Sequence, residues 1–523
     1  MLTTMRHLLL FISCVCLSPV KPALGSLPAP PSAPKKNVLF LVADDAGFEM
    51  GSYRKKVVQT PNLDALAKKS LIFNNLFASV SSCSPSRASI LSGLPTHQNG
   101  MYGLHQSVHH FNSFDGIRSL PNLLRDHNIY SGIIGKKHVG PSEVYKFDYE
   151  ATEETHSIMQ VGRNITKMKL LVRDFLEKKP AEPFFLYVGF HDPHRCGHTH
   201  PEYGAFCQFF GNGETGMGHI PDWHPITYDP TQVEVPHFVQ DSLSARRDIA
   251  AQYTTISRLD QGVGLVLKEL ENAGELNNTL VIYTSDNGIP FAGGRTNLYD
   301  SGIRLPMLMS SPFHTERHYQ ATYAMSSHLD LVPTVLDWFS VPYPTIDISQ
   351  NQLLQPLTGK SLLPLLIKEP TDNGEAIFAS HNHHEVTMYY PMRAVRTKHF
   401  KLIHNINYRM PFPIDQDLYI SRSFQDILNC TREKKPIHWS KTLKTYYYRP
   451  EWEFFDLRKD AEELRNVAGK PAYKETMEDL KSKLLKWQEI TKDPWICSPN
   501  GVFENSGTFK DNPACLPLDN LDF

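Results

Sequence analysis

The chain has 523 residues, and its 53 lysines and arginines are balanced by 55 aspartates and glutamates, giving a formal net charge of −2. Hydrophobic residues make up 41% and charged residues 21%, which is ordinary for a globular protein and excludes a disordered or fibrous one. The balanced charge argues against a nucleic-acid partner, because such binding needs a basic excess. A chain of this length is expected to form two or more structural units.

The first 25 residues are typical of a secretory signal peptide. Arg6 gives a positive start, residues 8–17 are apolar, and Ala23-Leu24-Gly25 offers small residues for cleavage. An uncleaved membrane anchor is the alternative, but the apolar stretch is short for a spanning helix. No later stretch is long and apolar enough to span, so we expect no membrane partner. The signal peptide predicts entry into an oxidising compartment.

The cysteines and sequons fit that compartment. Short sequence separations favour two local disulfides, Cys196 with Cys207 and Cys497 with Cys515, although spacing alone does not prove the pairing. Cys83 and Cys430 are left without obvious partners. Three Asn-x-Thr sequons predict N-linked glycans at Asn164, Asn277 and Asn429.

Four apolar runs predict buried parallel strands, at residues 37–43, 129–134, 184–190 and 280–283. Helical patterns lie between them, the longest running from Tyr253 to Leu270 and closing near Gly274. This alternation predicts an α/β fold with a mainly parallel sheet. Each run ends in groups able to bind a metal or an anion, at the sheet edge where such folds bind ligands.

The sequence changes in character after residue 375. A hairpin is predicted over residues 392–405 and an amphipathic helix over residues 475–490. We therefore expect a catalytic domain over residues 26–375 and a smaller C-terminal α+β domain over residues 376–523.

One set of strand-end residues offers only hard oxygen ligands: Asp44, Asp45, Asp286 and Asn287. Such ligands favour Ca²⁺ or Mg²⁺ over zinc. Adjacent aspartates after a strand also serve as ordinary turn formers or helix caps. The second pair at an equivalent strand end makes the metal site the better interpretation.

A second motif is Cys83-Ser84-Pro85-Ser86-Arg87, which precedes the helical Ile90 and Leu91. The start of a helix favours an anion, and Arg87, about one turn later, can return to the same place. The alternative is a serine-rich helix cap with a buried cysteine.

These motifs resemble the sulfatase family. Its Cys-x-Pro-Ser-Arg signature stands at residues 83–87, its Gly-Lys-x-His-x-Gly motif at 135–140, its Asp-Asn-Gly motif at 286–288 and a C-terminal motif at 453–466. The resemblance spans about residues 37–470. It implies an alkaline-phosphatase-like fold, with a large mainly parallel mixed sheet between helices and a smaller C-terminal domain with an antiparallel sheet.

In this family the signature cysteine is oxidised to formylglycine by a formylglycine-generating enzyme, and one Ca²⁺ binds per subunit. The resemblance therefore implies that the aldehyde hydrate made from Cys83 attacks sulfur and later expels sulfate. It implies as metal ligands Asp44, Asp45, Cys83, Asp286 and Asn287. Arg87, Lys136 and His138 would stabilise the charge on sulfate and the hydrate.

Further strings resemble the branch of sulfatases that cleaves N-linked sulfate, at residues 103–106, 109–115, 190–198 and 411–417. That branch implies a homodimeric lysosomal enzyme acting on terminal N-sulfoglucosamine at the non-reducing end of heparan sulfate. His194 would then protonate the leaving nitrogen, being largely protonated in an acidic lysosome, with Asp192 beside it. Arg295, where many sulfatases have lysine, would clamp sulfate, and His384 and Glu385 are weaker candidates for sugar contact.

Three alternatives remain. An O-sulfatase acting on another glycosaminoglycan sugar is the nearest competitor. A phosphodiesterase of the same fold is less favoured, since such enzymes usually carry a serine or threonine nucleophile and histidine metal ligands. A non-catalytic binding protein would be expected to have lost a motif residue, yet every matched position is filled.

Overall fold

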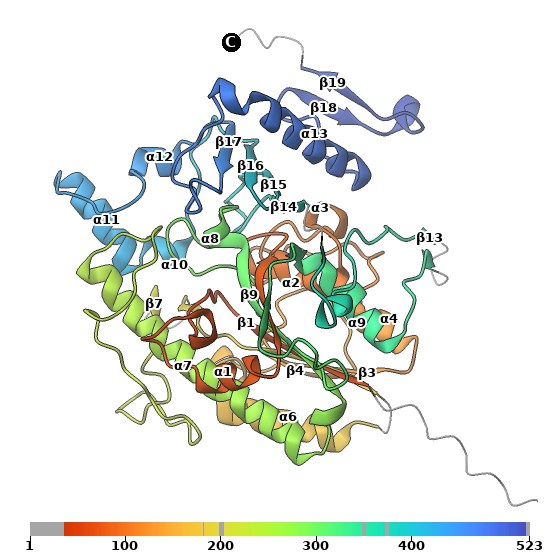
Figure 1. Cartoon of the computed structure of the whole chain (residues 1–523), viewed down its shortest axis with the longest axis vertical. Helices are drawn as coiled ribbons and strands as arrows, with labels where there is room; N and C mark the ends of the chain where they lie inside the picture. The colour runs from red at the N-terminus through yellow and green to blue at the C-terminus, as the bar shows by residue number, and fades with distance from the viewer. Residues whose placement is uncertain (1–35, 181–182, 198–202, 348–351, 372–375, 519–523) are drawn as a thin grey trace, which may run out of the picture. The chain divides into compact units, whose positions relative to one another are not determined.

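A nine-stranded mixed sheet organises the chain (Figure 1). The structure is a computed structural model that describes residues 36–180, 183–197, 203–347, 352–371 and 376–518. The predicted signal peptide, residues 1–25, lies outside the described residues. The strand order is β10-β2-β9-β8-β1-β5-β3-β4, with β11 also pairing with β2. In chain order these strands are β1 Asn37–Ala43, β2 Leu71–Phe77, β3 Tyr130–Gly135, β4 Tyr149–Thr152, β5 Phe184–Gly189, β8 Thr279–Ser285, β9 Arg304–Ser310, β10 Gln320–Thr322 and β11 Ser326–Ser327.

The strand directions bring several strand ends to one edge of the sheet. Strands β4, β3, β5, β1 and β8 are mutually parallel. Strand β9 is antiparallel to both β8 and β2, so β2 runs in the same direction as β8. The segments that follow six strands therefore emerge at a common edge, as the predicted parallel sheet requires. All four strands expected from the apolar runs are confirmed, as β1, β3, β5 and β8.

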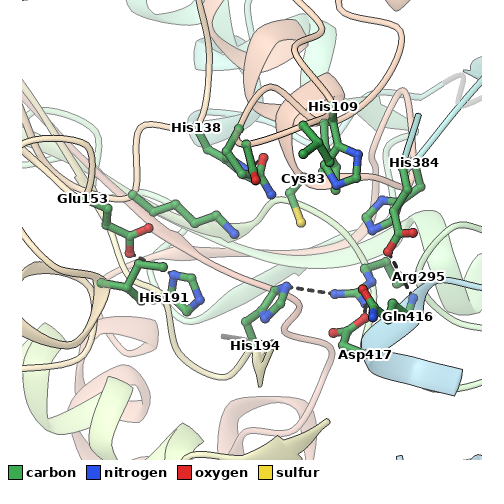
Figure 2. A pocket seen from close by; sticks show the side chains of 18 of the residues that line it. Cys83, His109, His138, Glu153, His191, His194, Arg295, His384, Gln416 and Asp417 are labelled. Atoms are coloured by element: carbon green, nitrogen blue, oxygen red, sulfur yellow. Dashed lines mark hydrogen bonds and ion pairs between the residues drawn. The ribbon is translucent and has the colours of Figure 1, made fainter. Parts of the chain in front are cut away.

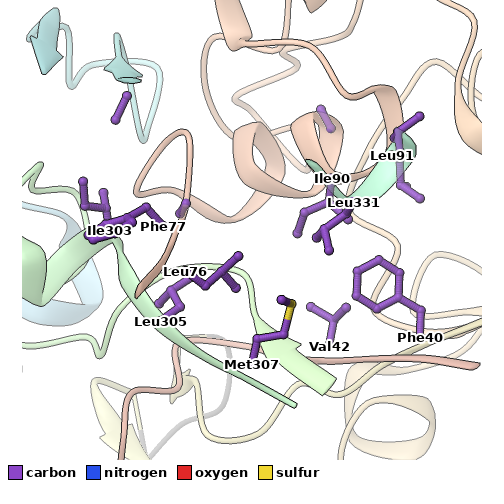
Figure 3. Packing of buried hydrophobic residues seen from close by; sticks show 14 of the residues in the cluster. Phe40, Val42, Leu76, Phe77, Ile90, Leu91, Ile303, Leu305, Met307 and Leu331 are labelled. Carbon is purple, nitrogen blue, oxygen red and sulfur yellow. The ribbon is translucent and has the colours of Figure 1, made fainter. Parts of the chain in front are cut away.

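Strand β1 shows why these runs are apolar on both faces. Val38, Phe40 and Val42 belong to one hydrophobic cluster, which includes residues of α2, α4 and α9. The intervening residues, Leu39, Leu41 and Ala43, belong to a second cluster with residues of α1, α6 and α7. Figure 3 shows Phe40 and Val42 facing Ile90, Leu91 and Leu331. Because side chains alternate along a strand, a central strand covered by helices on both faces must be apolar throughout.

The helices agree with the predicted patterns. The longest, α7, begins at Leu243, earlier than its apolar pattern indicated, because the Ser242 side chain accepts a hydrogen bond from the Ala245 N–H and caps it. It ends at Asn272, and Gly274 follows with φ of 72°. The other helices are α1 Pro61–Ala67, α2 Cys83–Ser92, α3 Thr96–Asn99, α4 Leu120–Arg125, α5 Ile158–Val161, α6 Ile165–Lys178, α8 Asp300–Ile303, α9 Leu331–Phe339, α10 Gln416–Tyr419, α11 Arg422–Arg432, α12 Leu443–Tyr447 and α13 Lys474–Ile490.

A separate antiparallel sheet contains the predicted hairpin. Its order is β14-β15-β16-β17, with bounds Ile377–His381, Met392–Arg396, Phe400–Asn405 and Trp452–Asp456. Leu480, Leu484 and Trp487 of α13, the predicted final helix, join Val395 and Leu402 of this sheet in one cluster. The antiparallel sheet is confirmed, whereas the domain boundary near residue 376 stays a prediction.

Both predicted disulfides are present. Cys196 pairs with Cys207, and Cys497 pairs with Cys515. Cys83 is a buried free thiol and Cys430 is a partly exposed one. The two disulfides accompany the short two-stranded pairs β6 Arg195–Cys196 with β7 Ala205–Phe206 and β18 Gly501–Glu504 with β19 Ala514–Pro517; a further pair is β12 Ile346–Asp347 with β13 Gln352–Leu353. Among the described residues, no helix combines the length and apolar character that a membrane span requires.

Candidate active site

A cavity of about 440 Å³ opens at the edge where the parallel strands end. Figure 2 shows Cys83 in it between His138, His194 and Arg295. Cys83 is the first residue of α2, which follows β2. The other three come from segments after β3, β5 and β8, so the direction of the strands brings together residues that are far apart in sequence.

The other four predicted metal ligands lie together beside Cys83. The Asn287 side-chain amide donates to Asp45 Oδ1 at 2.6 Å, and Cys83 Sγ lies 4.0 Å from the same oxygen. Potential ligand atoms of Asp44, Cys83 and Asp286 all lie within 4.8 Å of one another. The Asp45 N–H also donates to Asp286 Oδ1, at 3.1 Å, which ties the ends of β1 and β8 together.

The electrostatics of this cluster fit a divalent cation. Burial raises the pKa of Asp45 to about 6 and that of Asp286 to about 8, so crowded carboxylates resist ionising there without a further positive charge. Asp44 Oδ1 and Asn287 Oδ1 are buried and accept no hydrogen bond from the described residues. Buried oxygen atoms that accept no hydrogen bond are suitable ligands for Ca²⁺ or Mg²⁺.

Two buried cations flank the carboxylates. Arg87 Nε donates to Asp286 Oδ2 at 2.9 Å, and its NH1 donates to the Lys136 carbonyl at 3.0 Å. The Lys136 ammonium donates to Asp44 Oδ2 and lines the cavity. Arg87 is fully buried behind the cavity wall, so the structure shows its contact with the carboxylates, while its contact with sulfate stays a prediction.

The two predicted histidines both line the cavity. His138 has a positive φ of 59°, its N–H donates to Glu154 at 3.0 Å, and its ring contacts Gln106. His194 Nδ1 donates to the Arg195 carbonyl at 2.6 Å, which leaves Nε2 to accept from Arg295 at 3.0 Å.

The expectation that His194 is largely protonated in an acidic compartment is wrong for the unliganded protein. Burial lowers the pKa of His194 to about 3, and the neighbouring Lys136 and Arg295 add to this effect. A bound anion would oppose the shift, because an adjacent negative charge favours the imidazolium form.

Arg295 is held by three carboxylates. Its NH1 lies 2.6 Å from Asp45 Oδ2, and its NH2 contacts Asp417 at 2.5 Å and Asp415 at 3.2 Å. Sequence reasoning assigned no role to Asp415 or Asp417. Asp415 caps α10 and Asp417 lies in its first turn, so neither follows a strand, and only the resemblance of residues 411–417 to known enzymes singled this segment out.

Asp192 needs a correction. It is 1% exposed and does not line the cavity. Its carboxylate accepts from Arg258 at 2.7 and 2.9 Å and from Arg163, so both oxygens are occupied by buried cations. We therefore no longer assign Asp192 a contact with the leaving nitrogen; its ion pairs position the loop that carries His194.

His384 and Glu385 both line the cavity, and Figure 2 shows His384 on the side opposite Glu153. His384 Nδ1 lies 2.8 Å from Ser82 Oγ, next to Cys83, and Glu385 accepts from the Gln416 N–H at 3.0 Å.

Sequence reasoning missed a second pair on the cavity wall. His191 Nδ1 lies 2.8 Å from Glu153 Oε1, and burial raises the pKa of Glu153 to about 8. His191 lies two residues after the end of β5, so the strand-end rule could have found it. Glu153 follows β4, a short strand whose polar sequence gives no such signal.

Comparison with known proteins agrees with this geometry. A family profile described as sulfatase matches residues 36–341, and one described as N-sulphoglucosamine sulphohydrolase, C-terminal, matches residues 294–415. The chain is 59% identical over 485 residues to N-sulphoglucosamine sulphohydrolase of Homo sapiens, covering 93% of this chain and 95% of that protein. It is 24% identical to an N-acetylglucosamine-6-O-sulfatase of Bacteroides thetaiotaomicron, covering 88% and 87%.

Solved structures share the fold. One, determined in complex with its substrate D-glucosamine-2-N,6-O-disulfate, has a TM-score of 0.61 at 21% identity and covers 88% of this chain and 98% of its own. A phosphonate monoester hydrolase from Silicibacter pomeroyi has the same TM-score at 16% identity, covering 92% and 99%. At such identities the likeness concerns the fold alone. The profile that spans more than half of the chain and the 59% identical human relative show that the chain belongs to the sulfatase family.

Proposed function

We propose that this protein hydrolyses the N-linked sulfate of terminal N-sulfoglucosamine residues during heparan sulfate degradation in the lysosome. The observation that carries the proposal is the 59% identity, over 93% of the chain, to an enzyme named for this reaction. The cavity supports it, because about 440 Å³ suits a single sulfated sugar. An O-sulfatase acting on another glycosaminoglycan sugar is the alternative that the experiment below separates.

Formylglycine made from Cys83 would supply, as its hydrate, the nucleophile for sulfur. A Ca²⁺ held by Asp44, Asp45, Asp286 and Asn287, with the modified residue 83, would supply the positive charge that the buried carboxylates lack. These ligands are proposed from their clustering and from the two oxygen atoms that accept no hydrogen bond from the described residues.

The chain's own groups divide the remaining work. Lys136 and Arg295 line the cavity and offer positive charge to the sulfate oxygens, and Arg87 holds Asp286 in place. His194 Nε2 accepts from Arg295 in the unliganded protein. With the N-sulfated sugar bound, the negative charge of its sulfate group would favour protonation of Nε2. His194 would then deliver that proton to the leaving amine, which must gain one as the N–S bond breaks.

Mass analysis of the tryptic peptide that contains residue 83 tests the nucleophile. We expect an aldehyde in place of the thiol, and a complete, unmodified thiol in an active protein would contradict the mechanism. Sulfate release from N-sulfoglucosamine and from glucosamine 6-O-sulfate tests the substrate. Release from the second sugar alone would establish the O-sulfatase instead, and a Cys83→Ala protein controls for contaminating activity.

We also propose a homodimer, maturation by a formylglycine-generating enzyme, and N-linked glycans. Asn277 and Asn429 are exposed, while Asn164 is half-buried and its side-chain oxygen caps α6 by accepting from the Lys167 N–H at 3.0 Å. Removal of glycans by an endoglycosidase from wild type and from Asn277→Gln and Asn429→Gln proteins would show which sites are occupied.

A further inference from the structure

A row of aromatic side chains joins the catalytic cavity to a second cavity. We call it the aromatic track, and in spatial order it consists of Phe111, His383, Tyr389, Trp495, Tyr102 and Phe114. None of these residues lines the catalytic cavity. They come from the loop after α3, the loop after β14 and the segment after α13, so the track exists only in the folded protein.

The first half of the track starts beside the catalytic cavity. Leu104 lines that cavity, and its carbonyl accepts from the Phe111 N–H at 3.2 Å. The Phe111 ring lies 5.0 Å from the His383 ring, which lies 5.0 Å from the Tyr389 ring. His383 directly precedes His384, which lines the cavity, so this end of the track borders the proposed sugar site.

The second half reaches the other cavity. Trp495 Nε1 donates to the Tyr389 hydroxyl at 2.9 Å, and the Trp495 ring lies 5.4 Å from the Tyr102 ring. The Tyr102 ring lies 6.2 Å from that of Phe114, which lines a second cavity of about 340 Å³. Tyr389 is 46% exposed and Phe114 50% exposed. The other four rings of the track are half-buried. A continuous row of half-buried and exposed rings between two cavities needs an explanation that isolated surface aromatics do not.

The second cavity carries polar atoms that make no hydrogen bond with the described residues. His97 lines it and is 5% exposed, yet neither of its ring nitrogens hydrogen-bonds to any described residue. Burial lowers the pKa of His97 to about 3, so the ring is neutral and offers one donor and one acceptor. Gln98, 8% exposed, has a side-chain oxygen that likewise lacks a hydrogen bond from the part of the chain described here. The exposed Lys492 adds a positive charge.

We propose that the aromatic track and the second cavity bind the sugar units that follow the terminal glucosamine in a sulfated oligosaccharide. Aromatic rings provide the flat apolar surface on which sugar rings stack, with polar edges left for hydroxyl groups. Imidazole and amide groups suit hydroxyls, and Lys492 suits a sulfate or carboxylate. This inference rests on the proposed function, because the terminal sugar must occupy the catalytic cavity for the chain to continue along the track.

Steady-state sulfate release from two substrates tests the proposal: the monosaccharide N-sulfoglucosamine and a heparan sulfate hexasaccharide with the same terminal sugar. In wild type the hexasaccharide should have the lower KM. The double substitution of the exposed rings, Tyr389→Ala with Phe114→Ala, should raise the KM for the hexasaccharide about tenfold and leave the monosaccharide KM unchanged. Tyr323→Ala, which removes a tyrosine 57% exposed outside the track, is the matched control and should change neither KM.

Several outcomes would overturn the proposal. One is an unchanged hexasaccharide KM in a double variant that melts at the wild-type temperature. Another is a change of oligomeric state on gel filtration, which would make the track an interface between copies of the chain. If the double variant unfolds, Lys492→Ala at the exposed end gives the same test with a smaller expected rise. Failure of the wild-type protein to release sulfate from the monosaccharide would count against the proposed function instead, and binding of a hexasaccharide with an N-acetylated terminal sugar would still report on the track.

Discussion

Two buried groups of charged residues in this protein differ in how completely their polar atoms are satisfied. In the first, Arg393 of the antiparallel sheet donates to both oxygens of Asp493, at 2.5 and 2.8 Å. The Gln488 side-chain amide and the Trp495 backbone N–H each donate a further hydrogen bond to Asp493, at 3.0 Å. Burial alone would raise the pKa of Asp493, but Arg393 and these donors hold it well below its usual range.

The second group lies at the edge of the parallel sheet. Asp45 and Asp286 have raised pKa values even though Arg295 and Arg87 contact them. Asp44 Oδ1 and Asn287 Oδ1 accept no hydrogen bond from any described residue. A saturated ion pair stabilises the fold that contains it, whereas buried oxygens left without donors indicate a site that a ligand completes. Burial and charge alone would not separate the two groups.

The largest expected effect removes the reacting group and leaves both charged groups intact. Cys83→Ala should reduce sulfate release by about 10⁴-fold or more, because no nucleophile can form at residue 83. The fold should persist, since the change removes one buried sulfur atom. Sulfate release and a urea denaturation curve measure the two properties, and near-normal turnover would rule out Cys83 as the precursor of the nucleophile.

The next effect tests the saturated pair. Asp493→Asn should lower the free energy of unfolding by about 3–5 kcal/mol, because it leaves Arg393 buried without its counter-charge. Asp479→Asn is the matched control, since Asp479 forms an exposed pair with Lys483 on α13 and should matter by less than about 1 kcal/mol. Equal destabilisation by both substitutions, measured by urea denaturation, would remove the distinction drawn between the two groups.

A third effect follows from the raised pKa values of the carboxyl groups at the edge of the parallel sheet. Asp45 and Asp286 have folded-state pKa values of about 6 and 8, above the unfolded value of about 3.9. Between pH 4 and 8 these two carboxyl groups therefore bind more protons in the folded than in the unfolded protein, and the stability that they contribute falls as the pH rises. Buried histidines with lowered pKa values, such as His194, contribute with the opposite sign, so the carboxyl contribution is measured as a difference between two proteins. In a chelator, the free energy of unfolding of the wild type relative to that of an Asp45→Asn, Asp286→Asn protein should drop on the order of 3 kcal/mol from pH 5 to pH 8, because the histidines are common to both proteins.

Saturating Ca²⁺ should remove most of that drop, since the cation replaces the protons. Asp493 has the opposite sign: its lowered pKa gives stability that is present above about pH 4 and is lost as the pH falls further. If the stability of the wild type relative to the double variant stays constant or rises from pH 5 to pH 8 without metal, the cluster of Asp45 and Asp286 is not an incomplete site.

Much of the fold could be predicted because strong local patterns dictate it. Residues 38–43 are apolar at every position, as a strand buried on both faces requires, and the structure places them in β1. Strands with weaker patterns, such as β4, escaped prediction. The disulfides were predictable from short spacing, but a domain boundary has no comparable signal in one sequence.

The site was predictable where the sheet itself positions it. Asp44, Lys136 and Asp286 each follow a strand, and parallel strands bring those positions to one edge. Asp417 could not be found this way, because it lies in α10 and its contact with Arg295 depends on how that distant helix packs. Asp192 was assigned wrongly for the same reason, since sequence does not show that Arg163 and Arg258 occupy its oxygens.

The substitution with the smallest expected effect, at Asp45, is the most direct test of the difference between the two charged groups. At pH 5 Asp45 is protonated in the metal-free protein, so Asp45→Asn replaces it with a group of the same shape and charge. Arg295 keeps Asp415 and Asp417 as partners. The free energy of unfolding should therefore change by about 1 kcal/mol or less, in contrast to Asp493→Asn. The same substitution should abolish the Ca²⁺-dependent rise in melting temperature and remove the part of the pH dependence between pH 5 and pH 7 that Asp45 contributes. If it instead destabilises the metal-free protein as severely as Asp493→Asn does, then Asp45 is a structural ion-pair partner like Asp493, and the raised pKa of its carboxylate does not mark a ligand site.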